Sequence, residues 1–200
     1  MKKFFYLPIL LFFITGCITA AVKPKQENYM AKAVFDIDIS VPSKEVTQKL
    51  YEIINVRSDS LQKSEGFMPA KLPEIPNAPN VQLQNVGMGF VSFTLPKVQC
   101  DNAYAIMTGF DKGVSSFGLG SSDQASYTGC IYPYEKAYRI YIIGTFMNSS
   151  GGGLEGMVAE GIKKGITGST REMYGKWFGS ILNKFKETFP TAKEIEISMP

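Results

Sequence analysis

The segment from Ser126 to Met147 constrains the fold of this 200-residue chain more than any other, because it predicts two β-strands joined by a tight turn. The turn, Pro133-Tyr134-Glu135-Lys136, has the length and the residue types of a hairpin connection. Residues 137–147, which follow it, place large apolar side chains on both faces of the strand. Such a strand is covered from both sides, so we expect a β-sheet in which it lies centrally.

A strand and a helix are predicted before this hairpin. Between residues 34 and 41 the side chains alternate strictly between apolar and polar, which is the period of a strand with one buried face. Ser43 follows in a position to cap a helix, and apolar residues then recur at helical spacing. We therefore expect a helix over residues 44–55.

The C-terminal part predicts a helix followed by a strand. Ser169-Thr170-Arg171-Glu172 has the pattern of a capping box, and one side of the helix that it opens is apolar until Pro190 ends it. Ile195, Ile197 and Met199 then alternate with polar residues, which indicates a final strand.

Residues 57–124 are less regular and form a long, loop-rich insertion in this plan. Four prolines within residues 68–80 favour an extended loop, since proline lacks the amide donor that helices and central strands use. One strand is expected over residues 86–95, and residues 113–124 are expected to form a mobile loop. Residues 149–168 hold seven glycines, too many for a stable isolated helix.

Without the insertions, the predicted order is β-α-β-β-α-β. We expect a single α+β domain over residues 31–200, with an antiparallel sheet and helices on one face, as in the ferredoxin-like plan. A helix-grip arrangement is the alternative. Because such folds support many unrelated functions, function has to be argued from particular residues.

The first seventeen residues, MKKFFYLPILLFFITGC, predict targeting. Two lysines precede an apolar run of 11 residues, from Phe4 to Ile14, and small or polar residues then lead to Cys17. The run is about half of the roughly 20 residues that a transmembrane helix needs, so it indicates a cleaved signal peptide, residues 1–16. Its removal takes away two basic residues and leaves a nearly neutral chain. We therefore expect no nucleic-acid binding.

The end of this segment, Ile14-Thr15-Gly16-Cys17, resembles the lipobox of bacterial lipoproteins, with Ile where Leu is commoner. The resemblance covers residues 1–17 only. It implies that the thiol of Cys17 receives a diacylglyceryl group, that the bond before it is cut and that the new amine takes a fatty acid such as palmitate. Because two or more acyl chains anchor a protein stably, it implies a membrane-bound chain with a tether over residues 17–30. Ile18, where an Asp would favour the inner membrane, indicates the outer membrane and a domain facing the periplasm. An ordinary secretory signal with an incidental cysteine is the alternative.

Cys100 and Cys130 remain once Cys17 is assigned to lipid. In the oxidising envelope such a pair indicates a disulfide, and two buried free thiols are the alternative. The chain contains no histidine, which excludes catalysis through imidazole. Two thiolates without histidine do not complete a zinc site, so we predict neither a metal nor a cofactor.

Three further features are candidates for chemistry or binding. Asp36 and Asp38 share the polar face of their predicted strand, about 7 Å apart, where two carboxylates suit acid–base chemistry or a cation. A solvated polar face is the alternative reading of that pair. Ser43-Lys44 is a weak match to a Ser-Lys hydrolase, which needs no histidine. Tyr132 and Tyr134 are our candidate partner surface, provided that the edge of the hairpin is open.

The sequence thus predicts a non-catalytic, membrane-anchored envelope lipoprotein that binds another envelope component, in a secretion or outer-membrane assembly. One alternative is a lipid-anchored hydrolase that uses Asp36 and Asp38 or a Ser-Lys pair. The other is membrane or cell-wall binding through residues 149–168, where glycines recur at four-residue spacing.

Overall fold

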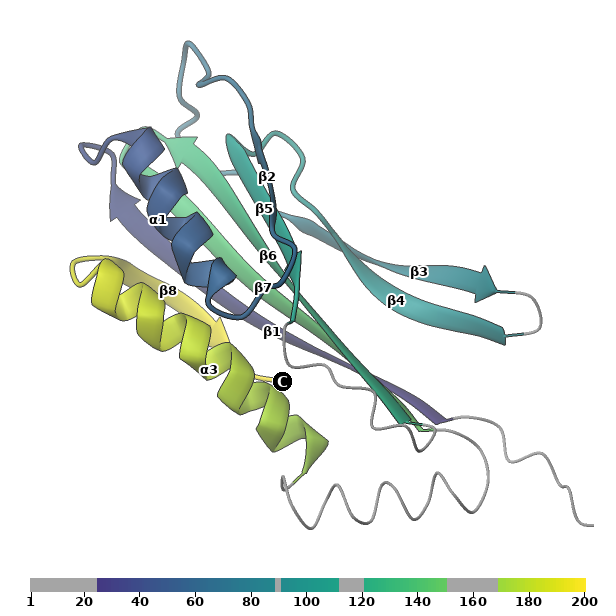
Figure 1. Ribbon diagram of the computed structural model, residues 1–200. Helices are drawn as coiled ribbons and strands as arrows, with labels where there is room; N and C mark the ends of the chain where they lie inside the picture. Colours follow the sequence, from purple (N-terminus) through teal and green to yellow (C-terminus); the bar gives the residue numbers. More distant parts are fainter. Residues whose placement is uncertain (1–24, 89–90, 112–120, 151–168) are drawn as a thin grey trace, which may run out of the picture.

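The computed structural model describes residues 25–88, 91–111, 121–150 and 169–200, and these form a mixed α/β domain (Figure 1). A six-stranded antiparallel sheet carries two helices on one face, and a separate two-stranded ribbon lies against the other face. The elements in chain order are β1 (Lys25–Asp38), α1 (Ser43–Asn55), β2 (Gln62–Glu65), β3 (Asn80–Met88), β4 (Val91–Gln99), β5 (Ala105–Phe110), β6 (Ser121–Tyr134), β7 (Ala137–Ser150), α3 (Thr170–Thr188) and β8 (Lys193–Ser198).

The order of strands in the large sheet is β2-β5-β6-β7-β1-β8, and every neighbouring pair is antiparallel. The predicted hairpin is confirmed, with β6 and β7 joined by the two residues Glu135 and Lys136. All fourteen residues of β7 pair with β6 on one side and with β1 on the other. The expected central position of this strand is therefore confirmed as well.

The main core lies between the sheet and the two helices. One face of the central strands meets the apolar sides of α1 and α3 in a single cluster, in which aromatic rings pack closely. Phe35 of β1 stacks on Phe185 of α3 with ring centroids 4.2 Å apart, and Phe146 of β7 stacks on Tyr174 at 4.7 Å. Because buried aromatic surface contributes strongly to packing energy, these contacts hold α3 on the sheet.

The helix ends agree in part with the sequence. The capping box at Ser169 is present: its hydroxyl accepts a hydrogen bond from the amide of Glu172, whose carboxylate accepts one from the amide of Ser169. At α1, Ser43 is the first helical residue and not the cap, so its expected capping role was wrong. Pro42 occupies the cap position, where its carbonyl accepts from the amides of Glu45 and Val46.

Three predicted boundaries were wrong. β1 begins at Lys25, so residues 25–30 of the expected tether belong to a strand that follows β7 along its whole length. The expected single strand over residues 86–95 spans the end of β3 and the start of β4. Residues 121–124, expected in a loop, begin β6. For β1 and β6 a long-range pairing partner, which the local pattern does not contain, decides where the strand begins, whereas residues 86–95 pair with one another across the β3–β4 hairpin.

The other face of the sheet is covered by the β3–β4 ribbon and by a disulfide-linked cluster. Val34, Cys100, Cys130, Tyr132 and Tyr141 form a second buried cluster there, and Val98 of β4 packs against it. The side-chain amides of β1 residues 26 and 28 donate hydrogen bonds to the carbonyl of Thr94 in β4, at 2.7 and 2.8 Å. These contacts tie the ribbon to the sheet through β4.

Candidate functional site

The structure describes some of the predicted site residues and not others. Cys17 and residues 151–168 lie outside the described ranges, so the lipidation and the role of the glycine-rich segment stay predictions. Cys100 and Cys130 form a disulfide, with their Cα atoms 5.9 Å apart. It links the loop that follows β4 to the middle of β6, and both side chains are buried.

Tyr132 and Tyr134 do not form the open partner surface that we expected. β6 is paired with β5 and with β7, so it is not an edge strand, and the two tyrosines are only 1% and 8% exposed. The ring of Tyr132 meets that of Tyr141 edge to face at 5.7 Å. Burial raises the pKa of the Tyr132 phenol above its ordinary value. This part of the prediction was wrong because the insertion lies beside this end of β6: β5 pairs with it up to Ile131, and residues of the loop 66–79 line a pocket together with Tyr132.

Asp36 and Asp38 are not arranged as a catalytic pair. Asp36 forms a two-pronged ion pair with Arg139, its cross-strand neighbour on β7, and accepts a hydrogen bond from the hydroxyl of Tyr134 at 2.9 Å. The bonds to Asp36 raise the pKa of the Arg139 guanidinium. Asp38 is exposed, and its bond from Ser40 lowers the pKa of its carboxyl group. Asp36 is thus engaged in holding two strands together, and Asp38 in shaping the turn before α1.

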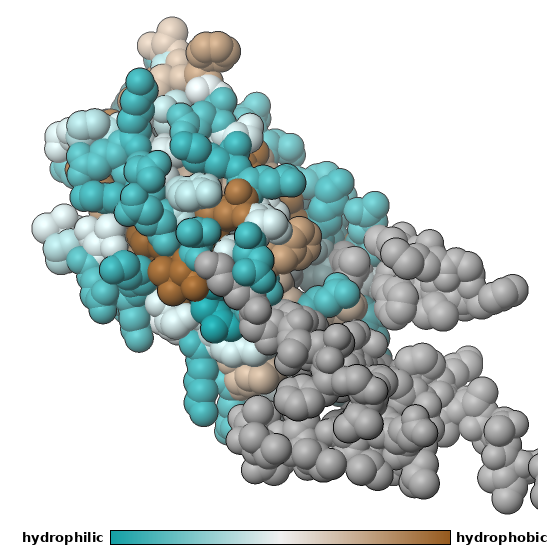
Figure 2. Space-filling view, in the orientation of Figure 1, coloured by the Kyte–Doolittle hydropathy of each residue, from teal (hydrophilic) through white to brown (hydrophobic). Residues whose placement is uncertain are grey.

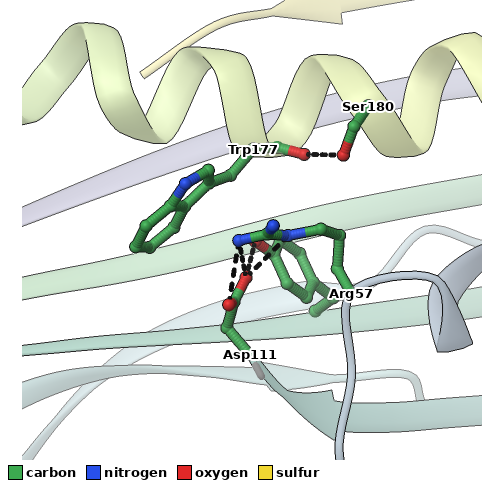
Figure 3. A network of polar contacts seen from close by, with 5 residues as sticks. Arg57, Asp111, Trp177 and Ser180 are labelled. Atoms are coloured by element: carbon green, nitrogen blue, oxygen red, sulfur yellow. Dashed lines mark hydrogen bonds and ion pairs between the residues drawn. The ribbon is translucent and has the colours of Figure 1, made fainter. Parts of the chain in front are cut away.

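A buried ion pair that the sequence analysis did not identify lies on the helix side of the sheet (Figure 3). The guanidinium of Arg57 donates to both carboxylate oxygens of Asp111 at 2.9–3.1 Å, and the hydroxyl of Tyr127 donates to Asp111 at 2.7 Å. The Asp111 side chain is 0% exposed, and Arg57 lies 5.0 Å from the centre of the Trp177 ring. Burial, followed by the bond to Asp111, raises the pKa of the Tyr127 phenol. This cluster connects the chain just after α1, the end of β5, strand β6 and helix α3. No local sequence motif predicts it.

The most exposed apolar side chains lie in the proline-rich loop between β2 and β3, residues 66–79. Phe67 is 98% exposed and Ile75 is 79% exposed. Figure 1 shows this loop projecting from one end of the molecule, and Figure 2 shows apolar side chains gathered at that projecting end. Exposed apolar groups gathered in this way are typical of a docking surface for another molecule.

Backbone hydrogen bonds hold the same loop to the domain at two points, before and after Phe67. The amide of Gly66 donates to the carbonyl of Tyr104 at 2.7 Å, and the amide of Glu135, in the β6–β7 turn, donates to the carbonyl of Pro73 at 3.1 Å. Pro73, Pro76 and Pro79 are half-buried, whereas Glu74, Ile75, Asn77 and Ala78 between them are exposed. A three-residue period is that of the polyproline II helix. Residues 73–79 thus pack three of the loop's prolines against the domain and present the side chains between them outward.

A groove lies between the β3–β4 ribbon and the large sheet, with a volume of about 370 Å³. Four hydroxyl side chains line it, those of Thr108, Ser126, Thr128 and Thr145, and the Ser126 and Thr145 hydroxyls are hydrogen-bonded at 2.7 Å. Apolar side chains such as Phe110 and Met147 line the rest, and Lys97 is the charged residue among its described lining. Such a lining suits a small, neutral, partly apolar ligand.

Comparison of the chain with protein-family profiles, with curated proteins and with solved structures finds no match. In the described ranges, no helix is both long and apolar enough to cross a membrane. Over the same ranges, histidine, cysteine and acidic side chains form no group of three or more that could hold a metal ion.

Proposed function

We propose that this chain is a lipid-anchored envelope lipoprotein that is not an enzyme and that binds another envelope protein through the proline-rich loop, residues 66–79. The single observation that carries the proposal is the nearly complete exposure of Phe67, on a loop that hydrogen bonds at Gly66 and Pro73 hold to the domain. The lipobox at Cys17 supplies the location, in the outer membrane with the domain in the periplasm.

The geometry of the sheet supports this arrangement. β1 begins at Lys25, eight residues after Cys17, and pairs with β7 from Lys25 opposite Ser150 to Asp38 opposite Ala137. Because a strand rises about 3.3 Å per residue, this ladder is roughly 45 Å long. Pro73 is bonded to the turn at its far end. The start of β1, which follows Cys17 in the chain, and the exposed loop thus lie at opposite ends of the β1–β7 ladder, which supports an arrangement with the loop directed away from the membrane.

The chemistry of the loop supports a protein as the partner. Aromatic and large apolar side chains dominate the energy of protein interfaces when they enter a pocket on the partner. Prolines limit the freedom of the chain, so little conformational entropy is lost when Phe67 and Ile75 are bound. We infer a partner that offers an apolar pocket to Phe67 and a second contact to Ile75.

A non-catalytic role agrees with the state of the candidate catalytic groups. The Asp36 carboxylate is occupied by Arg139 and Tyr134, and the Ser43 hydroxyl, the weak Ser-Lys candidate, accepts a hydrogen bond from Tyr104 at 3.3 Å. The alternative, a hydrolase that uses Asp36 and Asp38, therefore has the weaker support.

For the finer fold class, we propose the ferredoxin-like plan for the core. The four strands that remain without the insertion have the order β8-β1-β7-β6, with α1 between β1 and β6 in the chain and α3 between β7 and β8. This order of strands, the antiparallel pairing of all neighbours and the two helices on one face of the sheet support this class. β2, β3, β4 and β5 are then additions from the insertion.

The experiment that tests the function is site-specific photo-crosslinking in living cells. A photoreactive amino acid is placed at Phe67, at Ile75 and, as the control, at Lys184, which is exposed on α3. We expect the same single envelope protein to be joined to positions 67 and 75 and not to position 184. The purified partner should then bind the wild-type chain and lose affinity for Phe67→Ala. Equal labelling at all three positions, or unchanged binding by Phe67→Ala, would contradict the proposal.

The anchor is tested separately. Labelled palmitate should enter the wild-type chain, and Cys17→Ser should neither take it up nor sediment with membranes. Uptake of label by Cys17→Ser would refute the lipid anchor and would leave the loop interface open to its own test.

A further inference from the structure

The outer edge of β3 differs from the other strand edges that are unpaired along their whole length in the described ranges. Four strands have such an edge: β2, β3, β4 and β8. Three of them carry charged residues, as natural proteins commonly arrange to prevent edge-to-edge association. β3, with the sequence NVQLQNVGM, carries neither a charge nor a proline.

The other strand of the same ribbon shows the contrast most clearly. β4 contains Pro96 and Lys97, both of which discourage pairing with a further strand. The carbonyl of Thr94, also in β4, accepts hydrogen bonds from the side-chain amides of Gln26 and Asn28. Residues 80–84 of β3 are all exposed, and the described part of the chain places no strand beside them. A two-stranded ribbon is at best marginally stable by itself, so an added strand would stabilise it.

We propose that β3 pairs antiparallel with β3 of a second copy of this chain, joining two ribbons into one four-stranded sheet. The composition of β3 favours a second copy over an unrelated strand. In a two-fold antiparallel pair only the residues beside the axis lie near their own counterparts, so with the axis at residues 82–84 a charge there would meet a like charge. Gln82 and Gln84 avoid this, because an amide both donates and accepts hydrogen bonds and is complementary to itself.

The apolar residues of β3 fit the same arrangement. Val81 and Leu83 are 37% and 72% exposed and alternate with Gln82 and Gln84, so they lie on one face of the ribbon. A two-fold axis perpendicular to the ribbon keeps that face continuous across both copies. Leu83 then approaches the apolar residues of the other β3, and part of its exposed surface is buried.

The test uses two differently tagged full-length copies that are expressed together, solubilised in mild detergent and recovered through one tag. We expect the second wild-type copy to be recovered with the first. Gln82→Lys expressed with Gln82→Lys should reduce this recovery up to about fivefold, because like charges meet on neighbouring strands, and Gln82→Glu with Gln82→Glu should do the same. Gln82→Lys expressed with Gln82→Glu should restore recovery to the wild-type level or above.

Gln62→Lys is the matched control, since Gln62 is also exposed, on the edge strand β2. It should leave recovery unchanged, and all variants should keep the wild-type thermal transition. Three results would each overturn the pairing: no recovery between wild-type copies, recovery that like charges do not reduce, or a mixed pair that recovers no better than the like-charged pairs. The pairing uses no residue of the loop 66–79, so it stands or falls independently of the proposed function.

Discussion

Replacing Arg57 by methionine tests whether the buried ion pair holds the domain together. Methionine keeps an unbranched apolar side chain beside Trp177 but removes all three hydrogen bonds from the guanidinium to Asp111. The Asp111 side chain is 0% exposed, so water compensates its charge poorly once the guanidinium is gone, although the bond from Tyr127 remains. Removing one partner of such a buried pair costs about 3–5 kcal/mol. For a domain of this size, that corresponds to a fall in Tm of roughly 6–20 °C.

The measurement is urea and thermal unfolding of the full-length chain in mild detergent, followed by circular dichroism and by the fluorescence of Trp177, the single tryptophan. Lys184→Met is the control, because Lys184 forms an exposed pair with Glu187 at 3.7 Å, and such pairs contribute about 0–1 kcal/mol. Asp111→Asn completes the cycle. In the double variant the buried charge is gone and the amide oxygen still accepts from Tyr127.

We expect the double variant to be about 2 kcal/mol more stable than Arg57→Met alone. The reasoning is refuted if Arg57→Met loses less than about 1 kcal/mol, or if adding Asp111→Asn recovers none of the loss.

Three further predictions concern packing, the disulfide and the buried tyrosines. A Cβ at Gly109 would lie 2.6 Å from the Cβ of Ser58, so Gly109→Ala should destabilise the protein by about 1–3 kcal/mol. Gly179→Ala, where nothing lies within 4 Å on α3, should be neutral or up to about 1 kcal/mol stabilising in the same unfolding assay. Reduction of Cys100–Cys130, which closes a loop of 30 residues, should cost about 3.5 kcal/mol, and the oxidised chain should be two hydrogens lighter by mass spectrometry. Both thiols reacting with an alkylating agent in native extracts would contradict this pairing. Burial raises the pKa values of Tyr127, Tyr132, Tyr134 and Tyr138 above 10.0, so these phenols stay protonated in the folded state while the unfolded state ionises. Stability should therefore be unaffected by them below pH 10 and fall as the pH rises above it, and ultraviolet titration that shows all tyrosines of the folded chain ionising together would refute this.

Local patterns determined the elements whose partners are local. The hairpin of β6 and β7, the capping box of α3 and the helical period of α1 follow from residues within a few positions of one another, and all three are present. The lipobox is also local, which is why the sequence alone predicts the location. The pair Cys100 and Cys130 could be assigned because only two cysteines remain after Cys17.

Tertiary structure alone decided which strands are edges and which side chains are buried. Tyr132 and Tyr134 looked like an open surface because nothing in the hairpin reveals that the insertion lies beside β6, with β5 paired up to Ile131 and the loop 66–79 near Tyr132. Asp36 looked like half of a carboxylate pair because Arg139 is more than one hundred residues away in the chain. The ion pair of Arg57 and Asp111 and the exposure of Phe67 were missed for the same reason. Burial and charge pairing depend on which distant parts of the chain lie nearby. A periodic sequence pattern indicates only the face of the helix or strand on which a residue lies.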